Sequence, residues 1–169
     1  RSWVKPGTAI ALLVDRSGSM GGKPLATSAM AAAAVAWRSP EDYSVIAFGK
    51  DVVVAKGQTS TKSGEQVVND VLSLRGFGTT DLAGALIAAG DQLSRTRAGR
   101  RITVILSDCR ATVEGDVQAA ARALDEVVIL APLGDDAEAR VLASQVGARI
   151  ACIDGPSDIP SALQTVLGD

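Results

Sequence analysis

The sequence predicts an α/β fold of three layers (α/β/α), in which helices cover both faces of a doubly wound, mainly parallel sheet. Short apolar runs that suit buried strands alternate along the chain with longer segments of helical periodicity. Aromatic residues make up only 3% of the chain, so its core is built mostly from Val, Ile, Leu and Ala, which suits close helix–sheet contacts. We expect six strands, one of them a short antiparallel strand at an edge.

The strands are predicted where apolar runs end in polar or glycine-containing turns. Ala9–Val14 and Ile102–Leu106 are apolar runs of the length expected of fully buried strands in a parallel sheet. Only Gly49-Lys50-Asp51 separates Tyr43–Phe48 from Val52–Ala55, and a turn this short makes that pair antiparallel. Two further strands are expected at Glu126–Ala131 and Ala148–Ile153.

Helices are predicted where apolar residues recur at spacings of three and four. The segment Asp81–Leu93 shows this spacing most clearly, and its first residue suits an N-cap. Trp3 and Trp37 are expected to be packing residues. The expected helices are Leu25–Trp37, Gly64–Leu74, Asp81–Leu93, Gly115–Leu124, Ala137–Val146 and Pro160–Leu167.

The composition excludes several classes of function. The chain contains no histidine, which removes Ser-His-Asp triads, histidine general bases and ordinary zinc or haem sites. A formal net charge of −2 gives no general attraction to nucleic acid or to an anionic membrane. No apolar run approaches the length of a membrane span. Cys109 and Cys152 stand alone rather than in a CxxC motif, which favours a reducing, cytoplasmic compartment.

The length favours one domain over residues 1–169, because 169 residues can bury a sizeable core and no linker or low-complexity segment interrupts the pattern. The chain begins at Arg1 without Met, so we expect this domain to be part of a longer chain. The dense basic run of Arg95, Arg97, Arg100 and Arg101 follows a predicted helix, where cations usually belong to a solvated surface.

Three polar loops carry the candidate functional residues. Two of them directly follow apolar strands, and the carboxyl ends of parallel strands meet at one edge of a sheet, where ligands bind if the strand order reverses there. Taken singly, these residues suit turns and helix caps; taken together, they form a set of oxygen ligands for a hard cation such as Mg²⁺, Mn²⁺ or Ca²⁺. The oxygen-bearing residues are Asp15, Ser17, Ser19, Thr79, Thr80, Asp81, Ser107 and Asp108.

These loops resemble the metal-ion-dependent adhesion site (MIDAS) of von Willebrand factor type A (vWA) domains, whose fold is Rossmann-like. Asp15-Arg16-Ser17-Gly18-Ser19 matches the family's DxSxS motif, and Gly78-Thr79-Thr80-Asp81-Leu82 is similar to its Gly-x-Thr-x-Leu element. Ser107-Asp108 matches the Thr/Ser-Asp pair that follows the family's fourth strand. The three elements occur in the family's order over essentially the whole chain.

The resemblance implies a role for each residue at the metal. Ser17 and Ser19 would ligate it directly, and Thr80 would do so in a ligand-bound state. Asp15 and Asp108 would act largely through water. Thr80 is preferred to Thr79 because it lies two residues before Leu82.

Charge counting suggests what such a site does. Neutral hydroxyl ligands leave the cation under-neutralised, so a carboxylate from a partner can replace a water and supply the missing charge. We therefore expect a protein-interaction module that binds an Asp or Glu of a partner protein and is not an enzyme. Met20-Gly21-Gly22-Lys23-Pro24-Leu25 also resembles bacterial members, many of which work with AAA+ ATPases, which implies a role in complex assembly or cofactor maturation.

Two other classes of function stay open. One is a magnesium-assisted phosphoryl transferase or hydrolase with Asp15 or a serine as nucleophile, although the motif lacks the second Asp of an aspartyl-phosphate loop and no general base is visible. The other is an extracellular adhesion domain. The chain also departs from the family at Cys109, where the family usually has glycine; either the thiol is tolerated in the local backbone conformation or it narrows the cleft.

Overall fold

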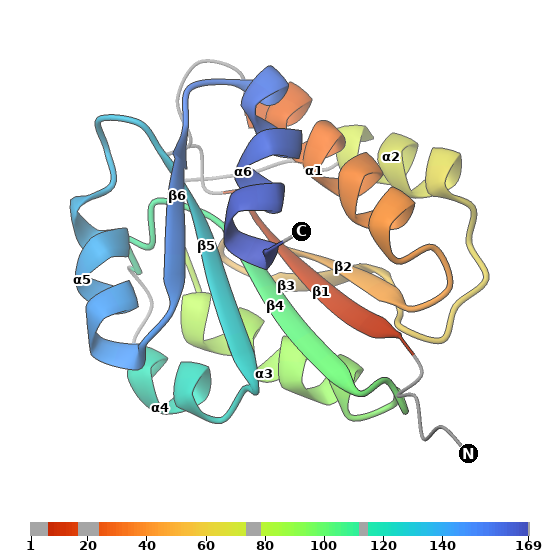
Figure 1. The fold of residues 1–169 in the computed structure, drawn as a ribbon, viewed down its shortest axis with the longest axis horizontal. Coiled ribbons are helices and arrows are strands. Elements are labelled where there is room, and N and C mark those ends of the chain that lie inside the picture. Colours follow the sequence, from red (N-terminus) through yellow and green to blue (C-terminus); the bar gives the residue numbers. More distant parts are fainter. Residues whose placement is uncertain (1–6, 17–23, 74–78, 112–114, 169) are drawn as a thin grey trace.

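The structure is a computed structural model that describes residues 7–16, 24–73, 79–111 and 115–168 (Figure 1). It contains one six-stranded sheet with the strand order β3-β2-β1-β4-β5-β6, and only β3 is antiparallel to its neighbour. This confirms the predicted fold class. The strands are β1 (Thr8–Asp15), β2 (Tyr43–Phe48), β3 (Val52–Lys56), β4 (Arg100–Leu106), β5 (Glu126–Pro132) and β6 (Arg149–Ile153).

The strand order reverses between β1 and β4. From β1 the chain proceeds to β2 and β3 on one side, and it then returns to place β4, β5 and β6 on the other side. Both neighbours of β1 are parallel to it, with Leu12 aligned with Val45 on β2 and with Val104 on β4. The loops that leave β1 and β4 therefore start at one edge of the sheet and diverge, which is the position of ligand sites in open α/β sheets.

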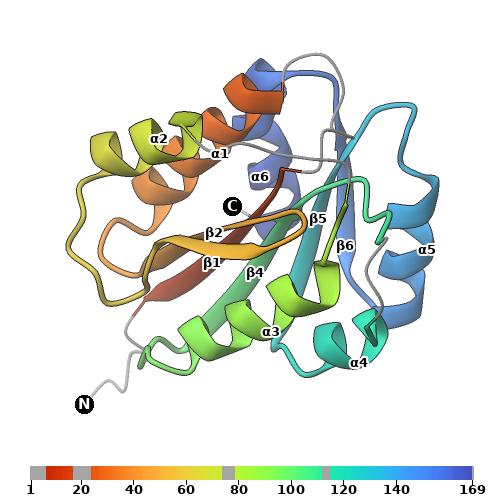
Figure 2. The same cartoon turned by 180° about the vertical axis from the view of Figure 1, so that it is seen from behind.

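Helices cover both faces of the sheet, as Figures 1 and 2 show from opposite sides. One face packs against α1, α2 and α6, and the other packs against α3, α4 and α5. Alternate residues of β1 divide between these two cores: Ile10 and Leu12 belong to the first, and Ala11 and Leu13 belong to the second. The helices are α1 (Pro24–Arg38), α2 (Gly64–Ser73), α3 (Leu82–Leu93), α4 (Val117–Arg122), α5 (Ala137–Val146) and α6 (Ile159–Leu167).

Aspartates and prolines determine where several helices begin. Asp81 is the N-cap of α3 and accepts a hydrogen bond from Gly84 N, as predicted. Asp116 caps α4 in the same way through Ala119 N, so α4 begins two residues later than expected and is shorter. A 3₁₀ turn at Pro156–Asp158 precedes α6. No helix in the described part of the chain is long and apolar enough to cross a membrane.

The basic run at the amino edge of the sheet is engaged in local contacts. Arg95 pairs with Asp91 on α3 at 3.0 Å, and Arg101 donates to the carbonyl of Thr96 at 2.9 Å. Arg100 forms two hydrogen bonds of 2.9 Å with Glu126 at the start of β5. These arginines therefore help to join strand and helix ends on the side of the sheet opposite to the polar loops.

The prediction that Trp37 packs in the core is wrong. Its side chain is 84% exposed near the end of α1. The buried positions of α1, such as Ala31, Ala32 and Val35, share one helix face, and Trp37 follows Val35 by two residues and lies off that face. Trp3 lies outside the described residues.

Trp37→Ser should change the free energy of unfolding by no more than about 0.5 kcal/mol, because the side chain loses little of its contact with water on folding. Leu86→Ala, in the fully buried face of α3, should cost about 2–5 kcal/mol. Urea unfolding of the two variants beside the wild type measures both effects. A loss above about 1 kcal/mol for Trp37→Ser would show that the indole packs in solution.

Candidate metal centre

Asp15 stands where β1 leaves the sheet. It is the last residue of the strand and aligns with Phe48 of β2, and the amide of Arg16 donates to the carbonyl of Phe48 at 2.7 Å. Asp15 is only 1% exposed. Burial lowers the pKa of the Arg16 guanidinium, and the neighbouring Asp15 carboxylate partly opposes this shift. Asp15 is thus a buried anion held by strand backbone rather than by a flexible surface loop.

Ser107 joins the end of β4 to the end of β1. Its hydroxyl donates to Asp15 Oδ2 at 2.6 Å and accepts from the amide of Cys109 at 2.9 Å. Its own amide donates to the carbonyl of Leu130 on β5 at 3.2 Å. The serine is fully buried, so these bonds fix the hydroxyl and, through it, the orientation of the Asp15 carboxylate. Sequence analysis placed Ser107 in a motif but did not predict that it links the ends of β1 and β4.

Asp108 is completely buried and incompletely paired. Its Oδ1 accepts from the amide of Arg110 at 3.0 Å, whereas its Oδ2 has no hydrogen-bond partner among the described residues. A buried carboxylate oxygen without a donor is costly and rare. A cation or a cation-bound water at this oxygen would remove the cost. The donor set at this edge therefore fits a metal ion.

Gly49 brings the second polar loop against the first. Its carbonyl accepts from the amide of Asp81 at 2.7 Å. A Cβ built on Gly49 would lie 3.4 Å from the carbonyl oxygen of Thr79 and 3.7 Å from the carbonyl carbon of Arg16, so both loops lie within van der Waals distance of this residue. Thr80 is buried within this arrangement, at 2% exposure. Sequence reasoning treated Gly49 only as a turn residue; its place directly after a strand end was the available signal.

Cys109 adopts a left-handed backbone conformation with φ = 63°, a region that favours glycine. The structure thus accommodates a cysteine at the position where the resemblance led us to expect glycine. Burial, followed by the nearby charges of Asp108 and Asp15, raises the pKa of the thiol to about 12. The thiol therefore stays protonated and unreactive near neutral pH. The effect of Asp108 and Asp15 on its pKa shows that both carboxylates lie close to it.

The structure brings Asp15, Thr80 and Asp108 to one edge of the sheet, at the reversal of strand order. Ser17 and Ser19 lie outside the described residues. Within the described ranges, no three His, Cys, Asp or Glu side chains gather closely enough to hold a metal ion by themselves. A cation at this edge would therefore depend on hydroxyl oxygens as well as carboxylates, which is a donor set for a hard ion.

Sequence comparison agrees with this geometry. Residues 10–111, which include β1, β4 and the loops described above, match the von Willebrand factor type A domain. The chain belongs to this family. Domains of this family are metal-dependent adhesion or interaction modules and are generally not enzymes. No curated protein matches this vWA domain by sequence.

Solved structures share the fold at low sequence identity. Manganese-loaded TRAP protein of Plasmodium vivax superposes with a TM-score of 0.74 at 16% identity, over 95% of this chain and 73% of that one. An aerotolerance-related membrane protein of Bacteroides fragilis gives 0.73 at 17% identity, over 96% and 100%. Mussel byssus proximal thread matrix protein 1 with a zinc-occupied MIDAS motif gives 0.72 at 15% identity, over 96% and 48%. This vWA domain thus spans about half the length of the mussel protein.

Replacing Cys109 separates backbone strain from side-chain burial. Cys109→Gly relieves the left-handed conformation, whereas Cys109→Ala keeps the Cβ and loses the same sulfur. We expect the free energy of unfolding of the Gly variant to exceed that of the Ala variant by about 1 kcal/mol, since a Cβ in this backbone region costs about 1–2 kcal/mol. Thermal and urea unfolding measure the difference. Equal stabilities, or a more stable Ala variant, would show that the left-handed backbone is not maintained in solution.

Proposed function

We propose that this vWA domain is a protein-interaction module in which a divalent cation at the edge between β1 and β4 captures an acidic residue of a partner protein. The observation that carries the proposal is the buried Asp108 Oδ2 with no donor, next to an Asp15 carboxylate that Ser107 holds in place. Two buried carboxylates at one edge repel each other unless positive charge lies between them. The motif residues include no lysine or histidine, and their one cation, Arg16, interacts with Asp15.

The residues that would hold the cation divide into charged and neutral donors. Asp15 and Asp108 contribute negative charge, and Thr80 contributes a hydroxyl from the second loop. Ser17 and Ser19 complete the set in the DxSxS motif. The bound ion would supply an under-neutralised positive centre that attracts a carboxylate. Ser107 Oγ holds the carboxylate of Asp15, and the amide of Arg110 holds that of Asp108. Neither carboxylate therefore needs to move when an ion binds.

An interaction role is favoured over phosphoryl transfer by the state of Asp15. A nucleophile must reach its substrate, but Asp15 is buried and its Oδ2 accepts a hydrogen bond from Ser107. The chain also has no histidine to act as a general base. These features suit binding without turnover.

Magnesium is the proposed physiological ion, because the donors are oxygens and Mg²⁺ is bound through few protein groups and several waters. The manganese-loaded and zinc-occupied relatives support a divalent cation without selecting one. We further propose that the partner belongs to an AAA+ ATPase system in the cytoplasm. This proposal rests on the resemblance of residues 20–25 to bacterial members and on the unpaired cysteines.

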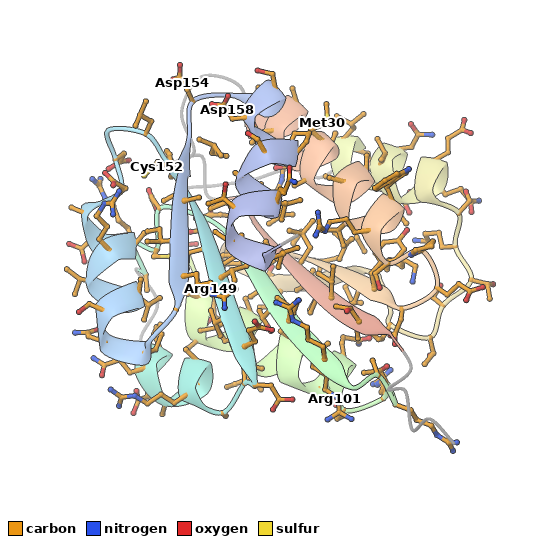
Figure 3. All side chains as sticks on the ribbon, viewed as in Figure 1. Met30, Arg101, Arg149, Cys152, Asp154 and Asp158 are labelled. Atoms are coloured by element: carbon orange, nitrogen blue, oxygen red, sulfur yellow. The ribbon has the colours of Figure 1, made fainter. Side chains whose placement is uncertain are left out.

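Asp15→Ala should abolish binding of Mg²⁺ and Mn²⁺ while the domain still folds, with a loss of about 1–3 kcal/mol in the free energy of unfolding because the buried Ser107 hydroxyl loses its acceptor. Asp154→Ala is the matched control: it removes an exposed aspartate, labelled in Figure 3, that follows β6 and is separated from β4 by β5. Calorimetric titration should show metal binding for the wild type and the control and none for Asp15→Ala.

The same three proteins, used as baits, test the interaction. Partner capture should require the metal, cease with EDTA and be lost in Asp15→Ala alone. If Asp15→Ala captures the wild-type partner equally well, the proposed function is wrong.

A further inference from the structure

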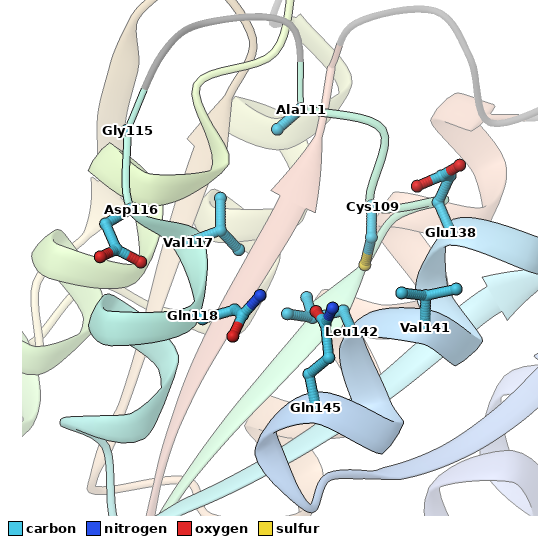
Figure 4. Close-up of a pocket in the computed structure, with 10 residues that line it drawn as sticks. All are labelled: Cys109, Ala111, Gly115, Asp116, Val117, Gln118, Glu138, Val141, Leu142 and Gln145. Atoms are coloured by element: carbon cyan, nitrogen blue, oxygen red, sulfur yellow. The ribbon is translucent and has the colours of Figure 1, made fainter.

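A groove of about 580 Å³ opens between α4 and α5, beside the candidate metal centre (Figure 4). Cys109 lines this groove, and its thiol points into it from the end of β4. The peptide bond between Asp108 and Cys109 is trans, which places their Cα atoms about 4 Å apart. The lining of the groove therefore begins one residue after Asp108.

The walls of the groove combine apolar and polar side chains. On α5 the lining residues Glu138, Val141, Leu142 and Gln145 follow the spacing of one helix face. Leu142 is buried, while Val141 is 51% exposed, which is unusual for a valine on a helix that packs against a sheet. Val117 of α4 lies on the opposite wall.

The rim of the groove carries uncompensated negative charge. Glu138, in the first turn of α5, is exposed and forms no hydrogen bond or ion pair with any described residue. Asp116 is also exposed, and its Oδ1 accepts a hydrogen bond from Ala119 N at 2.9 Å as the cap of α4. No lysine or arginine is among the described residues that line the groove.

The cations near the groove are engaged elsewhere. Arg110 and Arg140 form ion pairs with Asp135 and Asp136, in the turn before α5. Arg122 donates to a backbone carbonyl near the C-terminal end of α5 at 2.8 Å. The groove thus presents the apolar side chains of Val117, Val141 and Leu142 beside acidic residues and glutamines, which matches a side chain with a methylene stem and a positively charged head.

We propose that this groove takes an arginine or lysine side chain of the same partner whose acidic residue reaches the metal, an inference that rests on the function proposed above. The stem packs between Val117 and Leu142, and the head meets the carboxylate of Glu138 and the side-chain carbonyls of the glutamines on the two walls. The partner is therefore recognised by a short segment that carries a carboxylate and a cation a few residues apart. An acidic side chain is repelled, and an apolar one leaves Glu138 without a counter-charge.

Short synthetic peptides test this specificity. The test set carries Asp and Arg separated by zero to three alanines, in both orders. One control set replaces Arg by citrulline, a neutral side chain of nearly the same shape, and another replaces Asp by Asn. Affinities are measured by NMR titration of the Mg²⁺-loaded protein. We expect the best-spaced Asp/Arg peptide to bind roughly threefold or more tightly than its citrulline counterpart, with shifts at the amides of Cys109, Val117 and Leu142.

Two variants assign this preference to the groove. Glu138→Gln should remove the Arg-over-citrulline preference. Glu65→Gln, the same substitution in the first turn of α2, should retain it. Equal binding of the Arg and citrulline peptides, or a preference that survives Glu138→Gln, overturns the groove proposal and leaves the proposed function standing, provided that the Asp peptides bind better than the Asn peptides. Asp and Asn peptides that bind equally well in Mg²⁺ contradict the proposed function itself, and with it the shared partner.

Discussion

The hydrogen bond between the Ser107 hydroxyl and the Asp15 carboxylate joins the two strands on which the site depends. Asp15 ends β1 and Ser107 follows β4, and these strands are neighbours only because the chain reverses its direction of strand addition between them. The bond is buried and 2.6 Å long, so it is not weakened by competing water. It sets the position of one carboxylate and, through the amide of Cys109, the path of the loop that carries Asp108.

This constraint explains why the edge suits a cation. Folding brings Asp15 and Asp108 out of water, although Asp108 Oδ2 receives no donor from the described residues. The free-energy cost of that arrangement is offset when a divalent ion lies between the loops. In the proposed site the other donors would be neutral hydroxyls, so the ion would keep enough positive charge to attract a carboxylate from outside. The groove between α4 and α5 extends the same surface with an acidic rim. In our proposal, this rim adds a preference for an arginine or lysine near the partner's carboxylate.

Much of this could be predicted from sequence because strong local patterns determine it. The buried strands, the caps at Asp81 and the convergence of two strand ends follow from apolar periodicity and from the rules of parallel sheets. Trp37 could not be placed, because α1 is rich in alanine on all sides and its sequence does not mark which face is buried. The roles of Gly49 and Ser107 were not predicted, because they are contacts between loops far apart in sequence; the only local signal was that each residue directly follows a strand.

The central claim is that a divalent cation binds at the edge where β1 and β4 end. Titration with Mn²⁺, followed through the paramagnetic broadening of backbone amide signals, locates the ion directly. We expect the amides of Arg16, Thr80 and Cys109 to broaden first, while those of Lys56 and Arg101, at the opposite edge of the sheet, stay sharp until Mn²⁺ is in excess. EDTA should restore every signal. Broadening centred on any other part of the domain, or none at these three amides, would contradict the account.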